Sequence, residues 1–338
     1  MTIKDVAAYC GVAVSTVSRV LNNHPDVSPE TRARVLEAVD KLHYIPNNSA
    51  RDLVLAPADT IGLVVRGAEN PFYTPIIRTI EERCEEAGYT MVLHQIPVGA
   101  DEISAGATLV RSKRLKGLIF LGGRFDYSRA EGDAIGIPFA CCTNTNQFGD
   151  LDKSVYSSVS IDDYAEGYKA TKLLIDHGHT KIAVLLDSVR DHSISELRYA
   201  GYRQALVDAG IPLDEDLVLE TVDFTMSAAY ARTLAALEAR PDITAIFAVA
   251  DSMAIAAMKA LHNVGFSVPG ACSVVAIDGI EISQYTIPTL TTLVQPQETL
   301  GEEAFKTLLD VIEGTAPNRH VRLETSLREG ETLGKARS

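Results

Sequence analysis

Residues 3–21 read IKDVAAYCGVAVSTVSRVL, and this stretch decides the fold of the amino-terminal module. Its first eight residues place their apolar side chains on one face at helical spacing, and Gly11 then supplies the residue type that a sharp turn between helices tolerates. A second short helix is expected over residues 14–21, with two valines and a leucine inward and Arg19 outward beside two serines. Small polar groups and one guanidinium on a short helix suit the major groove of DNA.

A third helix is expected to follow after residue 28. Ser28 is placed as its N-cap and Pro29 as its first residue, and Val35, Val39 and Leu42 recur at helical spacing. Three helices of this size make a helix-turn-helix. The alternative is a small three-helix bundle that only docks on the rest of the chain.

The charge of the chain is distributed unevenly. The 338 residues carry a formal net charge of −14, yet residues 1–55 hold six basic and six acidic residues, so the acidity lies beyond them. DNA contact therefore has to come from a few placed groups on a neutral module, and non-specific affinity should be modest.

Three segments carry a resemblance to a known family: TIKDVA at 2–7, VSTVSRVLN at 14–22 and VSPETR at 27–32. They closely resemble the headpiece of the LacI/GalR family of bacterial transcription regulators. The resemblance implies that Val14, Ser15 and Arg19 read bases, with Arg19 as the partner of a guanine. Ala13 departs from the serine common in the family, and the lost cap should cost about 0.5–2 kcal/mol of local stability.

Residues 47–57 form a candidate hinge between Pro46 and Pro57. An isolated helix this short is marginal in water, so it should order only when something packs against it. The alternative is a plain linker, although flexible linkers are richer in Gly and Ser. The family resemblance implies that two such helices enter the minor groove, with Leu53 as the wedge. The expected DNA-contacting residues are Thr2, Val14, Ser15, Thr16, Ser18, Arg19, Asn22, Asn47, Ala50 and Leu53.

From residue 60 onward, short apolar runs alternate with helical stretches. Such βαβ alternation predicts two Rossmann-like parallel-sheet subdomains, in which ligands bind just beyond the carboxyl ends of the strands. Strands are expected near 61–65, 91–94, 117–121, 139–142, 182–186, 218–221, 245–249 and 273–277, and helices over 75–87, 163–177, 196–209, 227–239 and 252–264.

Carboxylates, an arginine and aromatic residues follow these strands, a set that suits a polyhydroxylated ring. Asp162 and Asp251 also stand where helices begin, so each could instead be a helix cap. Arg198 could lie on a solvated helix face, and Phe72 and Phe224 could be ordinary core. The candidate effector-binding residues are Phe72, Tyr73, Asp162, His192, Arg198, Phe224, Asp251 and Asp278.

The resemblance extends through DHGHTKI at 176–182, ADSMA at 250–254, IDGIE at 277–281 and LTTLVQP at 290–296. It implies a core similar to periplasmic sugar-binding proteins. Ala250 stands where many sugar-responsive members have Asn, which leaves the identity of the ligand open. The expected domains are a headpiece at 1–46, a hinge at 47–57, a first subdomain at 58–177 and 293–320, a second at 178–292 and 321–331, and a tail at 332–338.

The sequence therefore predicts a homodimeric, operator-binding repressor whose DNA affinity is set by a sugar-like effector, with no cofactor. Alternatives are a nucleobase or nucleoside effector on the same fold, and a sugar carrier without a DNA role. No phosphate-binding loop, nucleophile motif or zinc spacing occurs, and the five cysteines form no C-x-x-C pair, so neither an enzyme nor a metal site is expected. No export signal or membrane span is evident, which favours the cytoplasm.

Overall fold

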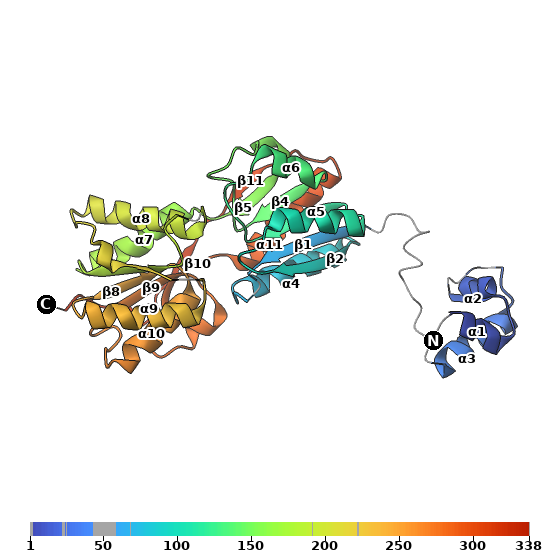
Figure 1. Ribbon diagram of the computed structural model, residues 1–338, viewed down its shortest axis with the longest axis horizontal. Coiled ribbons are helices and arrows are strands. Elements are labelled where there is room, and N and C mark those ends of the chain that lie inside the picture. Colours follow the sequence, from blue (N-terminus) through green and yellow to red (C-terminus); the bar gives the residue numbers. More distant parts are fainter. Residues whose placement is uncertain are drawn as a thin grey trace. The chain divides into compact units, whose positions relative to one another are not determined.

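The computed structural model describes residues 3–21, 24, 26–42, 59–67, 69–190, 192–221 and 223–337, without the side chain of Asp40. The chain divides into two compact units, residues 1–58 and 59–338. Each unit is described by itself (Figure 1).

The first unit is a three-helix module, as the sequence predicts. Its helices are α1 (Ile3–Cys10), α2 (Val14–Leu21) and α3 (Pro29–Lys41), and they pack around a small core that is centred on Val6, Val17 and Val35. The Ser28 hydroxyl accepts a hydrogen bond from the backbone N–H of Thr31 at 3.3 Å, which confirms its role as a cap. The backbone carbonyl of Ala13, and not a side chain, accepts from the N–H groups of Thr16 and Val17 at the start of α2.

The second unit contains two six-stranded sheets. The first sheet is parallel throughout, in the order β11-β5-β4-β3-β1-β2. Helices α5 and α6 cover one face and α4 and α11 the other (Figure 1). The elements are β1 (Thr60–Arg66), α4 (Tyr73–Glu86), β2 (Thr90–Ile96), α5 (Glu102–Lys113), β3 (Gly117–Leu121), α6 (Arg129–Ile135), β4 (Phe139–Cys142), β5 (Ser157–Ser160), α11 (Gln297–Ile312) and β11 (His320–Arg322).

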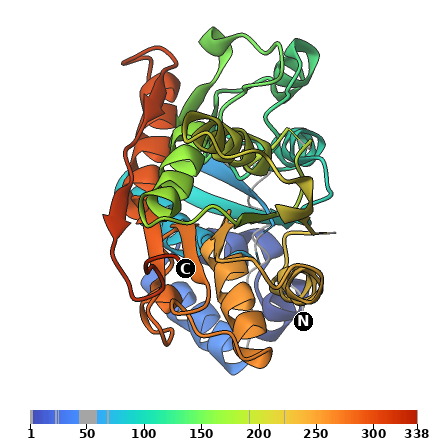
Figure 2. The same ribbon diagram turned by 90° about the vertical axis from the view of Figure 1, so that its left-hand side faces the viewer.

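The second sheet has the order β12-β10-β9-β8-β6-β7, with only β12 antiparallel to its neighbour among the described pairs. Helices α7 and α8 lie on one face and α9 and α10 on the other (Figures 1 and 2). The elements are α7 (Asp163–Asp176), β6 (Ile182–Leu186), α8 (Ile194–Asp208), β7 (Val218–Glu220), α9 (Met226–Ala239), β8 (Ala245–Ala248), α10 (Asp251–Asn263), β9 (Ser273–Asp278), β10 (Thr291–Val294) and β12 (Ser326–Arg328). Short 3₁₀ turns are η2 (Lys153–Val155), η3 (Glu215–Leu217) and η4 (Glu281–Gln284).

The two sheets define two subdomains, and the chain passes between them after β5, after β10 and after β11. The expected boundary at residue 177 is wrong, because α7 packs on α8 and on strands of the second sheet. The expected tail is also part of the second subdomain. Thr332 is fully buried, and its hydroxyl accepts from the backbone N–H of Thr291 at 2.9 Å.

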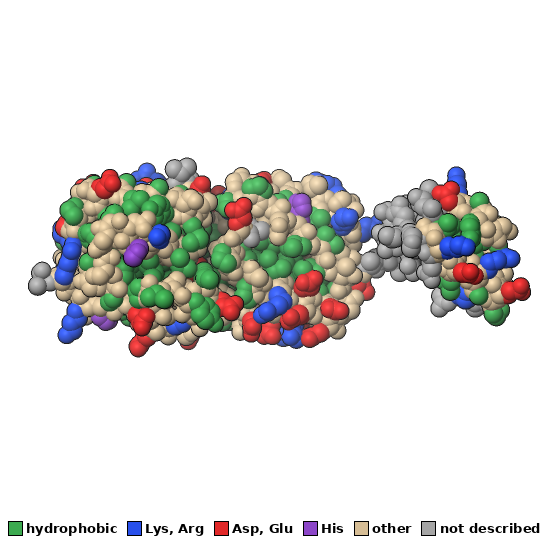
Figure 3. All heavy atoms as spheres, turned by 90° about the horizontal axis from the view of Figure 1, so that it is seen from below, with side chains coloured by type: hydrophobic (Ala, Val, Ile, Leu, Met, Phe, Trp, Pro, Cys, Tyr) green, Lys and Arg blue, Asp and Glu red, His purple; other side chains and the backbone are tan. Residues whose placement is uncertain are grey.

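Acidic and basic side chains of the first subdomain lie together on its surface. Figure 3 shows carboxylates and cationic groups gathered on the face where α4 and α11 lie. Arg78 pairs with Glu82 and Glu298, and Arg83 pairs with Glu86 and Glu302. The acidity of this unit is therefore partly compensated by its own arginines.

Candidate functional site

A large cavity lies between the two subdomains, beyond the carboxyl ends of both sets of strands. It has a volume of about 800 Å³ and is lined by residues that follow β1, β3 and β4 of one sheet and β6, β7 and β9 of the other. In the first sheet β1 lies between β2 and β3, and in the second sheet β6 lies between β7 and β8. The direction in which successive strands are added to each sheet therefore reverses at β1 and at β6. Open α/β sheets bind ligands at such switch points, so we call this cavity the cleft.

Arg198 is a buried polar residue of the cleft with several partners. It is 1% exposed, and its Nε and Nη2 each lie 2.9 Å from Asp163 Oδ1. Its Nη1 donates to the carbonyl of Val249 and lies 3.7 Å from Asp278 Oδ1. The alternative of a solvated helix face for Arg198 is therefore wrong.

Asp278 ends β9 with its side chain in the cleft, as the sequence predicts. Gln295 Nε2 donates to its Oδ1 at 2.9 Å. Its backbone has φ 138°, a conformation that L residues rarely adopt and that is common at functional sites. Burial raises the pKa of Asp278 above its ordinary value, and Arg198 opposes this shift.

The opposite wall of the cleft comes from the first subdomain. Arg66 ends β1, and its Nε lies 3.6 Å from Oε2 of Glu102, whose carboxylate is fully buried. Tyr73 lies against Gly122, where an added Cβ would come within 2.5 Å of the tyrosine hydroxyl. Burial raises the pKa of Tyr73, so its hydroxyl stays protonated and can donate.

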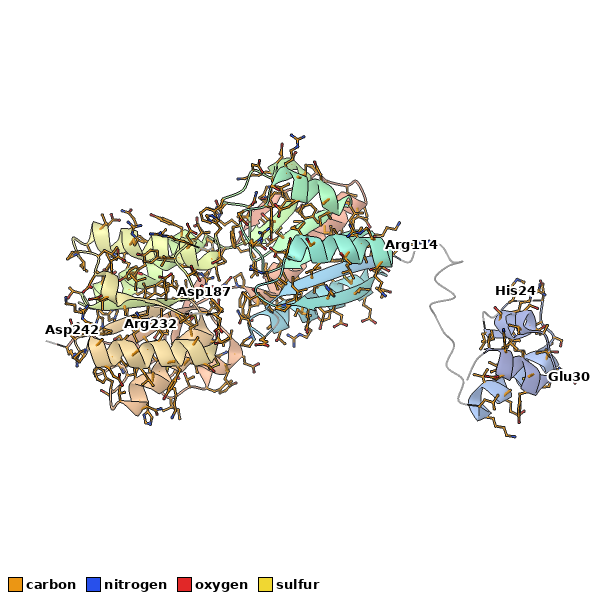
Figure 4. The ribbon with its side chains drawn as sticks, in the orientation of Figure 1. His24, Glu30, Arg114, Asp187, Arg232 and Asp242 are labelled. Carbon is orange, nitrogen blue, oxygen red and sulfur yellow. The ribbon has the colours of Figure 1, made fainter. Side chains whose placement is uncertain are left out.

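Two residues that line the cleft each carry a buried acceptor oxygen. Asp187 Oδ1 and Asn144 Oδ1 are buried, and neither has a hydrogen-bond partner within the described part of the chain. Asp187 directly follows β6 and lies on the side of the second subdomain that faces the first (Figure 4). Buried acceptors without donors are unfavourable, so these two oxygens indicate a ligand that donates hydrogen bonds.

Phe72 and Phe224 line the cleft from opposite subdomains. Phe72 is buried and belongs to the core of the first subdomain, while Phe224 is half-buried and packs against the core of the second. Phe72 and Phe224 therefore both pack with a subdomain core and line the cleft.

Three predicted residues lie elsewhere. The prediction that Asp251 lines the cleft is wrong, because it is fully buried inside the second subdomain. Its Oδ2 accepts from Ile280 N at 2.9 Å and from Ser283 Oγ at 2.7 Å, and its Oδ1 accepts from Thr292 Oγ1 at 2.5 Å. Asp251 therefore joins α10 to segments that follow β9.

Asp162 is the N-cap of α7, which confirms the capping interpretation. It accepts from Ala165 N at 3.1 Å and pairs with Arg322 at 2.6 Å. It lines a second cavity of about 280 Å³ and not the cleft. His192 also lies outside the lining of the cleft, where it contacts Phe148 of the first subdomain.

Sequence reasoning missed several polar residues of the cleft, hydroxyl-bearing as well as charged and amide side chains. Asp187 and Arg66 stand at strand ends, so the same rule could have found them. Gln295 follows β10, a strand that was not predicted. The missed residues with charged or amide side chains include Arg66, Asn144, Asp187, Asp223 and Gln295.

In the headpiece, Val14, Ser15 and Arg19 are exposed on α2, and Thr16 and Ser18 are half-buried. The remaining predicted DNA contacts lie outside the described residues; they are Thr2, Asn22, Asn47, Ala50 and Leu53.

A helix-turn-helix module and a ligand-binding core of two parallel-sheet subdomains together define a ligand-responsive DNA-binding protein. Residues 2–47 match the model of the bacterial regulatory proteins of the lacI family, and residues 171–333 match a periplasmic binding protein-like domain. The regulator MalR of Clostridium butyricum is 39% identical over 98% of this chain and 99% of its own length.

Solved structures agree with these matches. A complex of the transcriptional regulator CelR with cellobiose has a TM-score of 0.73 and 31% identity, covering 98% of this chain and 100% of that one. The lac repressor dimer bound to operator and the anti-inducer ONPF has a TM-score of 0.70 and 27% identity, covering 98% of each chain. The chain belongs to the lacI family of bacterial regulatory proteins and is a DNA-binding transcriptional regulator. The alternative of a carrier without a DNA role is therefore wrong.

Proposed function

We propose that the cleft binds an uncharged carbohydrate and that this binding changes the affinity of a homodimer for its operator. The observation that carries the proposal is a pair of residues that line one cavity from opposite subdomains, Asp187 and Asn144, each with a buried Oδ1 that has no hydrogen-bond partner among the described residues. Sugar hydroxyls donate hydrogen bonds to such oxygens and also accept them from groups such as the Tyr73 hydroxyl.

The charges of the cleft favour a neutral ligand over a phosphorylated one. Arg198 is paired with Asp163, and Arg66 faces Glu102. Each arginine of the cleft thus has a buried carboxylate beside it, so a phosphate would find little uncompensated positive charge. Phe72 and Phe224 supply apolar surface for the faces of a sugar ring.

Related proteins support this ligand class and this partner. A CelR chain has been solved with cellobiose, and a lac repressor dimer has been solved on its operator. We infer that this chain acts as a dimer on a pseudo-palindromic site with half-sites about one helical turn apart. In each headpiece, Val14, Ser15 and Arg19 would contact bases, and residues 47–57 would enter the minor groove.

Control of DNA binding then follows from linkage. A ligand that favours one arrangement of the subdomains shifts operator affinity by the difference between its affinities for the two arrangements and by no more. We assign no catalytic role to the cleft, and incubation should return cellobiose unchanged. The proposal places the chain in the cytoplasm. No helix within the described ranges is long and apolar enough to cross a membrane.

A melting screen tests the ligand class. Sugars, sugar phosphates, polyols and purines are each added in excess, because a ligand at ~100 times its Kd stabilises the folded state by ~2.7 kcal/mol. We expect a shift with neutral sugars and none with their phosphates. A shift with purines alone would favour a nucleobase, which Phe72, Tyr73 and Phe224 could stack against.

Two substitutions separate the two sites. Arg19→Ala should abolish the preference for operator over random DNA and leave the sugar-induced melting shift unchanged, because α2 and the cleft belong to different units. Asp278→Ala should abolish the sugar-induced melting shift and leave the preference for operator over random DNA unchanged. Both effects are measured by gel retardation and by melting, and operator preference that survives in Arg19→Ala would contradict the assignment of α2.

A further inference from the structure

The two subdomains touch at the margin of the cleft, at a contact to which none of the chain crossovers contributes. The backbone N–H of Phe125, in the loop after β3, donates to the carbonyl of His192, in the loop before α8, at 3.0 Å. The His192 ring packs on Phe148, from the loop after β4, with ring centroids 4.7 Å apart. We call Phe125, Phe148 and His192 the clasp.

Each side of the clasp is held by its own subdomain. The N–H of Phe148 donates to the carbonyl of Phe125 at 2.7 Å, which fixes the two loops of the first subdomain to each other. Glu196 Oε2 accepts from the backbone N–H of His192 at 2.9 Å and lies 3.3 Å from its ring Nδ1. His192 has φ 54°, a left-handed conformation that is uncommon outside glycine and that turns its carbonyl toward Phe125.

The clasp is also anchored to the wall of the cleft. Glu102 Oε1 accepts from the N–H of Arg124 at 2.7 Å and from the Tyr127 hydroxyl at 2.6 Å, so it grips the loop on both sides of Phe125. The other oxygen of the same carboxylate faces Arg66 in the cleft. A ligand that moves Arg66 therefore acts on the loop that carries the clasp.

Phe125 itself is almost fully buried and lines both the cleft and the second cavity. Phe148 and His192, in contrast, are partly exposed, with 38% of Phe148 and 49% of the His192 side chain accessible. One backbone hydrogen bond and one half-exposed ring contact make a weak and reversible tie.

We propose that the clasp is a non-covalent connection between the subdomains, distinct from the three chain crossovers and from the packing of Ile255 and Ile280 on the core of the first subdomain, and that it favours the arrangement in which both walls of the cleft meet the effector. Its role in effector binding rests on the proposed function, whereas its effect on subdomain arrangement does not. The three covalent crossovers define a hinge, and the clasp selects one position of that hinge.

The test measures the distance between the subdomains in the full chain without ligand. Spin labels are placed at Ala130→Cys on α6 and Val207→Cys on α8, both exposed, and the five native cysteines are buried. Labelled chain is diluted with unlabelled chain so that each dimer carries one labelled copy. We expect one narrow distance distribution for this background.

Phe148→Ala removes the ring contact from a partly exposed position, so the chain should still fold. We expect a second distance population that grows about fivefold, whereas Val155→Ala, a matched exposed residue of the same subdomain, should leave the distribution unchanged. An unchanged distribution in Phe148→Ala, or a broad one in the background, would overturn the clasp.

Calorimetry with cellobiose then tests the link to binding. Where cellobiose binds, its Kd should rise several-fold in Phe148→Ala and stay constant in Val155→Ala, and an equal Kd in all three chains would overturn the link. Where no carbohydrate binds the native chain, the proposed function fails and the distance measurement still decides the clasp.

Discussion

The two walls of the cleft hold their arginines in different ways. In the second subdomain, Arg198 is buried, bonded to Asp163 and to a backbone carbonyl, and close to Asp278. In the first, Arg66 is 19% exposed and has one carboxylate at 3.6 Å, and its buried Nε has no hydrogen-bond partner among the described residues. The arginine of the second wall thus has its polar contacts in place without a ligand, while the arginine of the first wall can still form a hydrogen bond to a ligand.

This difference suggests a division of labour in binding. A preorganised group loses little freedom when it binds, so the second subdomain should provide most of the affinity. Arg66 is held less firmly, and Glu102 connects it to the loop that carries Phe125. We therefore expect ligand binding at Arg66 to change the arrangement of the subdomains.

The largest effect is expected for Arg198→Met, which should abolish the sugar-induced melting shift. It should also lower the free energy of unfolding by about 3–5 kcal/mol, because Asp163 stays buried without its cation. Adding Asp163→Asn should recover part of the stability and none of the binding, as measured by denaturant unfolding and calorimetry. Full sugar binding in either variant would contradict the assignment of Arg198 to the binding site.

A smaller effect is expected for Arg66→Ala. Sugar affinity should fall about tenfold, the loss typical of one hydrogen-bonded charged group, and the free energy of unfolding should fall less than in Arg198→Met, because the buried Glu102 carboxylate keeps its hydrogen bonds from Arg124 N–H and the Tyr127 hydroxyl. Arg78→Ala, which removes an exposed ion-paired arginine of α4, is the control and should change neither. A loss as large as that of Arg198→Met would show that the two walls contribute equally.

The smallest effect on binding is expected for His179→Gln, far from the cleft. His179 Nδ1 lies 3.0 Å from Thr244 Oγ1, and its Nε2 lies 3.0 Å from Ser273 Oγ and from the carbonyl of Gly334. Burial lowers the pKa of His179 below its ordinary value of about 6.5. The folded chain therefore binds fewer protons than the unfolded chain just below that pH, and its stability should decline as the pH falls from about 6.5.

His179→Gln should make this decline shallower while sugar affinity at pH 7.5 stays unchanged. Unfolding in denaturant at several pH values measures both slopes. Equal slopes in the two chains would exclude His179 as the group responsible.

Much of the fold could be predicted from local patterns in the sequence. Helical spacing and the Ser28 cap predicted all three headpiece helices, and apolar runs predicted eight strands of the core, all of which are confirmed. β5 was missed because its residues, SSVS, are polar although buried. The boundary at residue 177 was misplaced because the partner of α7 is set by tertiary packing, which helical spacing does not reveal.

The site was less predictable than the fold. The strand-end rule placed Phe72, Tyr73, Arg198, Phe224 and Asp278 in the cleft, where the structure has them. The same rule failed for Asp251, because its partners Ser283 and Thr292 come from segments more than thirty residues away. A strand-end carboxylate that faces a ligand and one that binds its own chain look alike in sequence.

The central claim is that occupancy of the cleft by a neutral sugar changes operator affinity. The most direct measurement is a pair of titrations: operator binding with and without saturating cellobiose, or the sugar that the screen selects, and sugar binding with and without operator. Both affinities should change by the same factor, because the coupling free energy is reciprocal. Operator affinity that stays constant at every sugar concentration, with the sugar bound, would contradict the central claim.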